Sequence, residues 1–243
     1  MGISYPFRFR REPKPPRAGL TLATPDTLNP AMLDAVRAGS GDRIAVIGDG
    51  AAFTALADQT RDLLIDPAHG NWDFFADHPS DHARSSAVEA FLPAEPRICA
   101  GYTGAYRYVL LRAMEHGGRE PGAGLAAVRD LVRALPPEAV AEAAGHDPAN
   151  GHALRWGMTV LAGVTAPLLV IADHDPRFPR VSIARWLAGP ASTILFVRHD
   201  PDRPTRETDA VIASLRDHAM LGRIEVATTM DLSPALSEAE RAW

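Results

Sequence analysis

The sequence contains almost no lysine or cysteine. Of its 25 basic residues only Lys14 is a lysine, and Cys99 is its single cysteine. A Schiff-base enzyme needs a lysine in its pocket and a P-loop needs one directly after its glycines, so neither class is expected. A single cysteine excludes an intrachain disulfide, a cysteine-based zinc site and a cysteine-ligated iron–sulfur cluster, and it fits a reducing compartment.

Long hydrophobic runs are also missing from the sequence. The longest apolar stretch, residues 159–172, is too short to span a bilayer and contains Pro167. The first residues show no apolar segment of the kind found in secretory signals. We therefore expect a cytoplasmic protein with no membrane partner.

Charge is distributed unevenly along the chain. The net charge is −5, and residues 1–20 hold five basic residues and one acidic residue, a balance of +4 that leaves −9 for the rest. The net negative charge of residues 21–243 argues against a broad nucleic-acid-binding face. The segment 5–11 alternates aromatic and basic residues. It is interpreted as a clamp on phosphates or on a neighbouring copy of the chain, with a surface tail as the alternative.

Apolar periodicity predicts an alternation of strands and helices. Residues 43–47 form a β-branched run that ends in a glycine turn, which indicates a buried strand. A helix over residues 51–60 and a strand over residues 62–66 complete a βαβ unit. Further strands are predicted at 97–100, 168–172, 193–197 and 223–227, and further helices at 28–38, 83–91, 103–115, 181–187 and 206–220, with a helical pattern throughout 122–164.

The order of these elements predicts the fold class. Five or six strands alternating with helices are typical of an α/β fold with a doubly wound, mostly parallel Rossmann-like sheet. The uninterrupted helical stretch indicates a helical insertion that caps the sheet over about residues 103–165. We thus expect a basic, Pro-rich N-terminal arm at residues 1–20 and a single α/β domain at residues 21–243.

Histidine and aspartate follow two predicted strands in closely similar turns. Asp173 and His174 follow the first of these strands, His199 and Asp200 follow the second, and both turns contain His-Asp-Pro-x-x-Pro. Ligands of open parallel sheets bind outside the carboxyl ends of the strands. A histidine beside carboxylates suits proton transfer near neutral pH, so these four residues are predicted to be catalytic. The alternatives are a divalent metal site made by the same side chains, and turns without chemistry.

A glycine turn after the first predicted strand is the candidate cofactor site. Gly48, Asp49 and Gly50 let a ligand approach the backbone at a helix start, and Asp66 ends the next strand, where a carboxylate can hold ribose hydroxyls. Residues 43–67 are similar to the first βαβ unit of class I S-adenosylmethionine-dependent methyltransferases, although one glycine of that pattern is missing. The resemblance implies S-adenosylmethionine as the cofactor and a transferase activity. The alternative is a glycine turn in which Asp49 caps its helix.

A second local resemblance is to the RbsD/FucU sugar pyranases. Residues 29–33, residues 39–44 and Asp49 follow the opening run of that family, except that Ser40 stands at the position of the family's catalytic histidine. Residues 48–51 are also similar to the start of the thiamine-diphosphate motif, but the asparagines expected later in that motif do not follow at the right distance.

Together these patterns predict an enzyme that binds a nucleoside-type cofactor, with S-adenosylmethionine favoured, and acts on a small polar substrate rather than on nucleic acid. A second interpretation is a metal-dependent hydrolase or a sugar pyranase that uses the His and Asp residues. A third is a non-catalytic binding or assembly subunit, in which the N-terminal arm joins copies of the chain into a homo-oligomer.

Overall fold

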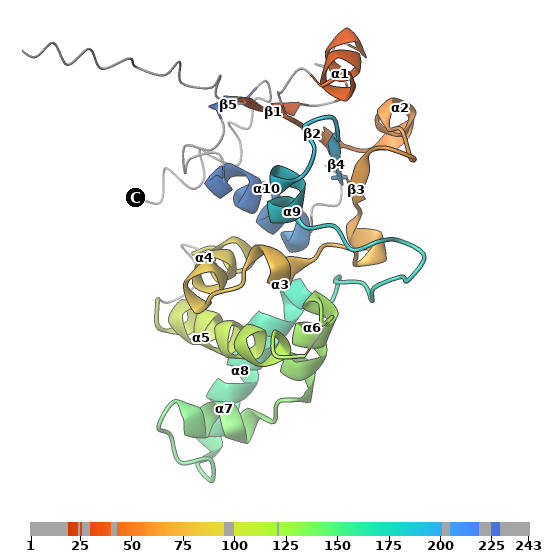
Figure 1. Ribbon diagram of the computed structural model, residues 1–243. Coiled ribbons are helices and arrows are strands. Elements are labelled where there is room, and N and C mark those ends of the chain that lie inside the picture. The colour runs from red at the N-terminus through yellow and green to blue at the C-terminus, as the bar shows by residue number, and fades with distance from the viewer. Residues whose placement is uncertain are drawn as a thin grey trace, which may run out of the picture.

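The computed structural model describes residues 19–23, 25, 30–39, 43–94, 100–120, 122–200, 205–218 and 225–228. Five strands form one sheet in the order β3-β4-β2-β1-β5, and every strand is parallel to its neighbours (Figure 1). The α/β class with a parallel Rossmann-like sheet is therefore confirmed. The strands are β1 (Gly19–Ala23), β2 (Arg43–Gly48), β3 (Leu63–Ile65), β4 (Leu195–Arg198) and β5 (Glu225–Thr228).

Strand β2 shows how the sequence divides the core between the two faces of the sheet. Its residues from Arg43 to Ile47 are all buried. Successive side chains of a strand point to opposite faces. Ile44 and Val46 accordingly join one hydrophobic cluster, whereas Ala45 and Ile47 join the other. Both faces are covered, as a doubly wound sheet requires.

Four helices provide this cover. α1 (Pro30–Arg37) and α2 (Gly50–Leu56) belong to one cluster, and α9 (Ile183–Ala188) and α10 (Arg206–His218) belong to the other. Phe53 of α2 packs edge-on against Phe196 of β4, with ring centroids 5.3 Å apart. In Figure 1 the two pairs of helices lie on opposite sides of the sheet.

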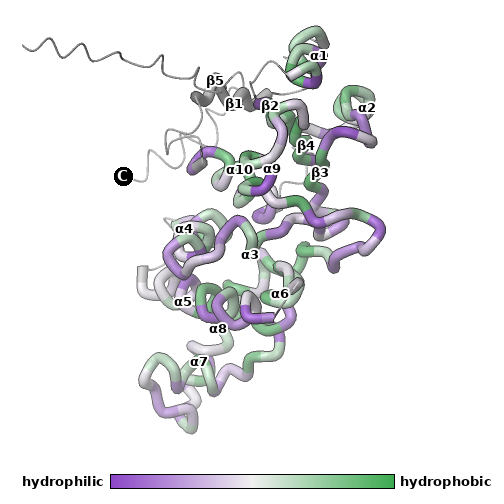
Figure 2. Tube along the Cα trace, in the orientation of Figure 1, coloured by the Kyte–Doolittle hydropathy of each residue, from purple (hydrophilic) through white to green (hydrophobic). Residues whose placement is uncertain are grey.

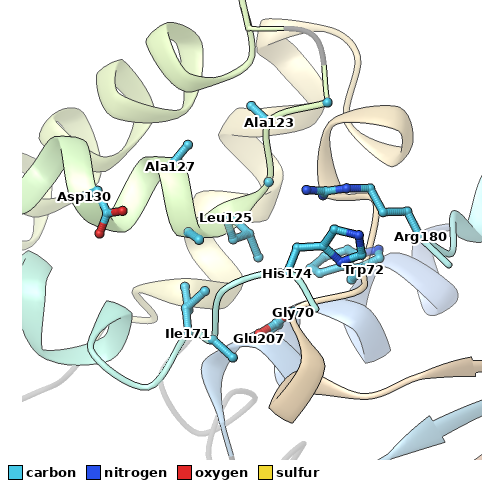
Figure 3. A pocket seen from close by; sticks show the side chains of 14 residues that line it. Gly70, Trp72, Ala123, Leu125, Ala127, Asp130, Ile171, His174, Arg180 and Glu207 are labelled. Carbon is cyan, nitrogen blue, oxygen red and sulfur yellow. The ribbon is translucent and has the colours of Figure 1, made fainter. Parts of the chain in front are cut away.

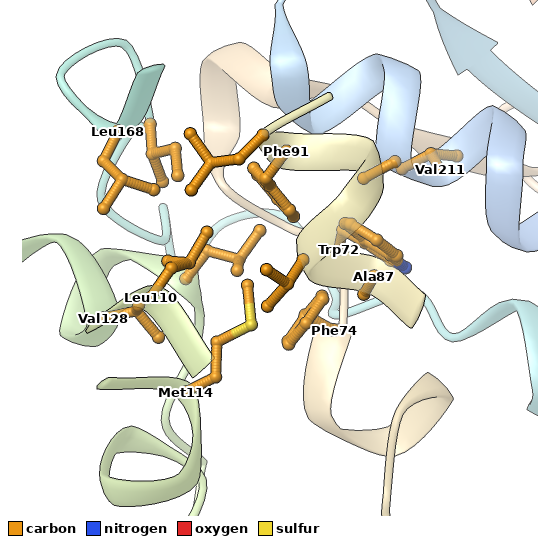
Figure 4. Close-up of a cluster of buried hydrophobic side chains, with 14 of the residues drawn as sticks. Trp72, Phe74, Ala87, Phe91, Leu110, Met114, Val128, Leu168 and Val211 are labelled. Carbon is orange, nitrogen blue, oxygen red and sulfur yellow. The ribbon is translucent and has the colours of Figure 1, made fainter. Parts of the chain in front are cut away.

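The remaining helices form a helical lobe on the side of α9 and α10. They are α3 (Phe74–Asp77), α4 (Asp81–Phe91), α5 (Ala100–Gly117), α6 (Leu125–Ala134), α7 (Pro137–Ala143) and α8 (Gly151–Leu168). Figure 4 shows the core where this lobe meets the sheet side of the molecule: Phe91 and Leu110 of the lobe belong to the same cluster as Val211 of α10. The predicted helical stretch 103–165 corresponds to α5–α8, while the division into domains remains a prediction.

The strand predicted at residues 168–172 is wrong. Val160, Val164 and Leu168 are buried at intervals of four, which is the spacing of a helix face, so this apolar run is the end of α8. Residues 169–170 are an exposed turn. The 171–182 loop then crosses to α9, and most of it is hydrophilic in Figure 2. Asp173 and His174 therefore lie in a loop and do not follow a strand.

Other differences lie near the ends of the described segments. β1 was not predicted, because Gly-Leu-Thr-Leu-Ala holds only two large apolar side chains. It includes the last two residues of the predicted N-terminal arm, whereas residues 1–18 lie outside the described residues, and the oligomeric contact assigned to the arm remains a prediction. Of the strand predicted at 97–100, only Ala100 is described, and it begins α5. Within the described residues, no helix has the length and apolarity needed to cross a membrane.

Candidate functional site

Charged side chains meet where β2, β3 and β4 end. The strand register places Arg198 beside Gly48, so its side chain reaches the residues that follow β2 and β3. Arg198 donates from Nη1 to Asp66 Oδ2 over 2.6 Å, and its Nε lies 3.4 Å from Asp49 Oδ1. A single guanidinium thus lies between the two carboxylates that were predicted to hold a cofactor.

Asp66 is buried and its carboxylate is engaged on both oxygens. Only 1% of its surface is exposed. Oδ1 accepts from Ala68 N over 3.0 Å, and Oδ2 binds Arg198 and lies 3.6 Å from His69 Nε2. The carboxylate therefore fixes the 3-10 turn Pro67–His69 against β4, which leaves no oxygen free for the hydroxyls of a ribose.

The fold itself explains the glycines of the predicted cofactor turn. A Cβ added at Gly48 would lie 2.8 Å from Pro25 Cδ, so a glycine is needed where the chain passes close to itself. Gly50 has φ +82°, a conformation that L side chains rarely adopt. Asp49 precedes α2 but makes no side-chain cap with it. These observations explain the Gly-x-Gly pattern without a ligand.

The two His-Asp turns have different surroundings. His199 follows β4, and its backbone N donates to Gly48 O over 2.9 Å, which keeps this residue and the following Asp200 at the sheet edge. The side chain of Asp173 is 82% exposed and pairs with Arg129 of α6 over 2.7 Å. His174 lines a pocket. The catalytic role of these four residues remains a prediction.

This pocket has a volume of about 290 Å³ and lies beside the carboxyl edge of the sheet. Figure 3 shows Ala123, Leu125 and Ala127 on the side of α6, with His174 and Arg180 of the 171–182 loop facing them. Trp72 and Glu207 complete the lining on the side of the sheet. The pocket is therefore enclosed by the helical lobe, the 171–182 loop and the first turn of α10.

Three polar side-chain atoms of this lining are buried without a hydrogen-bond partner among the described residues: His174 Nδ1, Arg180 Nη1 and Glu207 Oε2. They are three of seven such atoms in the part of the chain that the structure describes. A buried polar atom without a partner costs roughly 1–3 kcal/mol. Such atoms call for an explanation by water, an ion or a ligand, so their concentration here makes the pocket the candidate binding site.

Helix α6 begins at the pocket without a side-chain cap. Its N-cap residue is Gly124, and the first backbone N–H groups of a helix have no partner within the helix. Gly124 also makes room for Arg180, because an added Cβ would lie 2.6 Å from Arg180 Nη1. In Figure 3 the guanidinium points toward this end of α6. Arg180 and the first turn of α6 thus present positive charge to the same space.

Glu207 lies on the opposite side of the pocket, in the first turn of α10, and is only 3% exposed. Burial raises the pKa of its carboxyl to about 8, and the negative charge of Asp66 adds to the rise. The group is therefore mostly protonated at neutral pH and can donate a hydrogen bond. Asp130 is the other acid of the lining; it points away from the pocket centre in Figure 3 and accepts from Arg129 Nε over 2.9 Å.

The backbone on both sides of Arg180 is fixed by hydrogen bonds. Val181 N donates to Asn71 O and Asp73 N donates to Val181 O, each over 2.8 Å. The Asn71 amide donates to Pro179 O over 3.3 Å. The backbone that carries Arg180 is therefore fixed beside the pocket.

Sequence reasoning missed Arg180, Glu207 and the turn at residues 122–124. It did select His174, but on the expectation that this residue follows a strand at residues 168–172, where the structure has no strand. The available signal was Gly-Ala-Gly directly before the apolar periodicity of α6. Among the described residues, no group of three or more His, Cys, Asp or Glu side chains is arranged to hold a metal ion.

The fold defines the chain as an α/β protein with a parallel Rossmann-like sheet. Solved structures that share this fold include forms of the bacterial conjugative coupling protein TrwB. The unbound monoclinic form has a TM-score of 0.55 at 13% identity and covers 83% of this chain and 51% of that chain. The trigonal form with sulphate has a TM-score of 0.56 at 14% identity, and the complex with ADP and Mg²⁺ has 0.53 at 16%; both cover 83% of this chain and 52% of that chain.

The chain thus spans about half the length of the solved structures it matches. At these identities the likeness shows the fold alone. No protein-family model and no curated protein sequence matches the chain.

The expectation of an S-adenosylmethionine cofactor and a transferase activity is wrong. TrwB structures of this fold are complexes with ADP and Mg²⁺, with the ATP analogue ADPNP and with the GTP analogue GDPNP. The physical reason is that Asp66 and Gly48, which carried the resemblance, serve the fold itself by binding Arg198 and accommodating Pro25. The metal-dependent hydrolase and sugar pyranase alternatives belong to the same overturned expectation, because the solved structures that share the fold are nucleotide complexes.

Proposed function

We propose that this protein binds a phosphate-bearing ligand of the nucleotide class in the pocket between α6 and α10, and that it does not hydrolyse the ligand through a P-loop. One observation carries the proposal: three residues that line one pocket each have a buried polar side-chain atom without a partner among the described residues. The ligand is a small molecule, and the cytoplasmic location expected from the sequence is part of the proposal.

The nucleotide class is supported by the fold and by the position of the pocket. TrwB, which shares the fold, is known in complexes with adenine and guanine nucleotides. Open α/β sheets bind ligands in the crevice outside the carboxyl ends of their strands. A volume of about 290 Å³ lies at the lower end of the range for ligand sites, so the pocket suits a mononucleotide or part of one.

The absence of P-loop hydrolysis follows from the sequence between β1 and α1. A P-loop lies between a strand and a helix and contains Gly-x-x-x-x-Gly-Lys-Ser/Thr. Here residues 24–29 read Thr-Pro-Asp-Thr-Leu-Asn, with neither glycine nor lysine, and Lys14 precedes β1. Groups that contact phosphate must therefore come from elsewhere, and Arg180 with the first turn of α6 provides them.

Calorimetric titration of the full chain with ADP, ADPNP and GDPNP, each with and without Mg²⁺, tests the proposal. We expect at least one nucleotide to bind with an affinity that Mg²⁺ changes little, and phosphate release from ATP to stay at the background rate. Arg180→Ala should abolish measurable binding. Arg177→Ala is the matched control, because Arg177 belongs to the same loop, is exposed and, within the described part of the chain, pairs with Asp175 alone.

Two results would contradict the proposal. The first is no binding of any of the three nucleotides. The second is Mg²⁺-dependent hydrolysis well above background, which would require phosphate-binding groups outside this pocket.

A further inference from the structure

We infer that the pocket holds an oxyanion of its ligand, a phosphate or a carboxylate group, between the guanidinium of Arg180 and the first turn of α6, with the Glu207 carboxyl as a third hydrogen-bond partner. The inference rests on the function proposed above and names the ligand group that the pocket recognises.

Arg180 differs from Arg43 and Arg198 in having no hydrogen-bond partner among the described residues. Arg43 is buried and donates to the carbonyl oxygens of Trp186 and Gly189 over 2.7 and 2.6 Å. Arg198 binds Asp66. Arg180 Nη1 is equally buried but has no partner among the described residues. A guanidinium presents parallel donors that match the oxygens of phosphate or carboxylate, so an oxyanion is the ligand group that this side chain suits.

The start of α6 reinforces the same preference. The helix has ten residues, and its uncapped first turn adds partial positive charge and backbone donors where Arg180 points. The residues before the helix, Gly122-Ala123-Gly124, carry almost no side chain, so a ligand can come close to the backbone. Two sources of positive charge from distant parts of the sequence therefore meet in one space.

Glu207 is compatible with an anion because of its protonation state. An ionised carboxylate would repel a phosphate, but burial keeps this carboxyl mainly neutral at pH 7. The neutral group donates through its hydroxyl. His174 Nδ1, on the wall formed by the 171–182 loop, is a further polar atom without a partner among the described residues. The lining thus offers donors on two walls and no exposed negative charge that faces the pocket centre.

The first experiment titrates the full chain with inorganic phosphate and, separately, with acetate, at constant ionic strength, and follows binding by calorimetry or amide chemical shifts. Phosphate is expected to bind and to compete with the nucleotide. Arg180→Ala should weaken phosphate binding by about 10- to 100-fold, the effect of losing a hydrogen bond to a charged group. Arg180→Lys should retain part of the affinity, because it keeps the charge but loses the paired donors.

A glycine pair provides a matched control. Gly124→Ala places a Cβ 2.6 Å from Arg180 Nη1 and should displace the guanidinium, which we expect to weaken phosphate binding at least 10-fold. Gly104→Ala in α5 is the control, because a Cβ at Gly104 meets nothing within 4 Å. Circular dichroism and the unfolding midpoint establish that each variant is folded before binding is compared.

The outcomes separate the inference from the proposed function. If Arg180→Ala weakens nucleotide binding but neither phosphate nor acetate binds or competes, the oxyanion inference is overturned and the proposed function stands. If phosphate binds in a manner that depends on Arg180 and no nucleotide binds, the inference stands and the nucleotide proposal fails. Binding of acetate but not phosphate supports the inference with a carboxylate as the ligand group, and likewise overturns the nucleotide class.

Discussion

At the carboxyl edge of the sheet, Arg198 lies between Asp49 and Asp66, whereas in the neighbouring pocket Arg180 faces Glu207 and His174 without a partner among the described residues. Both regions combine arginine, histidine and carboxylic acid. At the edge the charges neutralise one another, so their role is to hold strands and turns together. In the pocket the polar atoms remain unsatisfied, which is the arrangement expected of a binding site.

The contrast has one exception at the edge. His199 Nδ1 and Arg198 Nε are also buried without a hydrogen-bond partner among the described residues. Arg198 Nε nevertheless faces Asp49 at 3.4 Å, within the range of an ion pair. The edge is therefore largely, but not completely, satisfied, and mutations in the two regions should differ in what they cost the fold.

Removal of Arg198, the cation at the carboxyl edge of the sheet, should have the largest effect on the free energy of unfolding. Arg198→Met leaves the carboxylate of Asp66 buried without its cation, and we expect the free energy of unfolding to fall by about 3 kcal/mol. Urea unfolding followed by circular dichroism measures the change, with Arg177→Met as the exposed control. A loss below about 1 kcal/mol would show that the edge is not held together by this ion pair.

Glu207 should make the stability of the fold depend on pH. Its pKa is raised in the folded state, so the folded chain retains a proton that the unfolded chain releases, and stability falls as pH rises from about 5 to about 8. We expect this loss to be on the order of a few kcal/mol. Asp66 contributes its negative charge to the rise in pKa, and His174, Arg180 and Asp130 are the other charged or titratable residues that line the same pocket.

Thermal unfolding of the native chain and Glu207→Gln at pH 5 and pH 8 measures this effect. The substitution should flatten the pH dependence and raise the unfolding temperature at pH 8. Glu142→Gln, on the exposed end of α7, is the control and should leave the profile as it is. An identical profile for the Glu207 variant would contradict the burial argument.

Arg180→Met should leave the free energy of unfolding unchanged or raise it by about 1 kcal/mol, because no partner among the described residues is left behind and an unsatisfied buried atom is removed. The same unfolding experiment as for Arg198→Met gives a direct comparison of two arginines in neighbouring sites. A loss as large as that for Arg198→Met would mean that Arg180 has a structural role, and the contrast between edge and pocket would then disappear.

Asp173→Asn should have the smallest effect. Its carboxylate binds Arg129 but its side chain is 82% exposed, and exposed ion pairs contribute less than about 1 kcal/mol. We expect a change within about 0.5 kcal/mol in urea unfolding. A larger change would show that the 171–182 loop depends on this contact as well as on its backbone pairing with residues 71–73.

The sequence allowed β2 and β4 to be predicted because their burial is continuous. β2 and β4 are short runs of large apolar residues that alternate between two cores, which is a local signal. Residues 168–172 have the same composition, but their preceding apolar residues repeat every fourth position, and the helix spacing prevails. A periodicity count extended back to Val160 would have assigned Leu168 to α8 instead of to the start of a strand.

The pocket could not be predicted in the same way, because its polar atoms come from separate elements. Glu207 lies in Thr-Arg-Glu-Thr at a helix start, a pattern typical of an exposed first-turn acid. Only the packing of the helical lobe against α10 buries it. No local sequence pattern marks Arg180 as a site residue, because the sequence contains 24 arginines and nothing in it distinguishes this one. The sequence analysis selected His174 because its turn resembles the turn that contains His199. In the structure a loop, and not a strand end, places His174 in the pocket lining.

The bridge between Trp72 and Val181 ties the loop that carries Arg180 to the segment that follows β3. One wall of the pocket is consequently attached to the sheet, while the wall made by α6 belongs to the helical lobe. Any molecule bound between them touches both halves of the chain and adds its binding free energy to their association. Occupancy of this small space would therefore set how firmly the lobe and the sheet are joined.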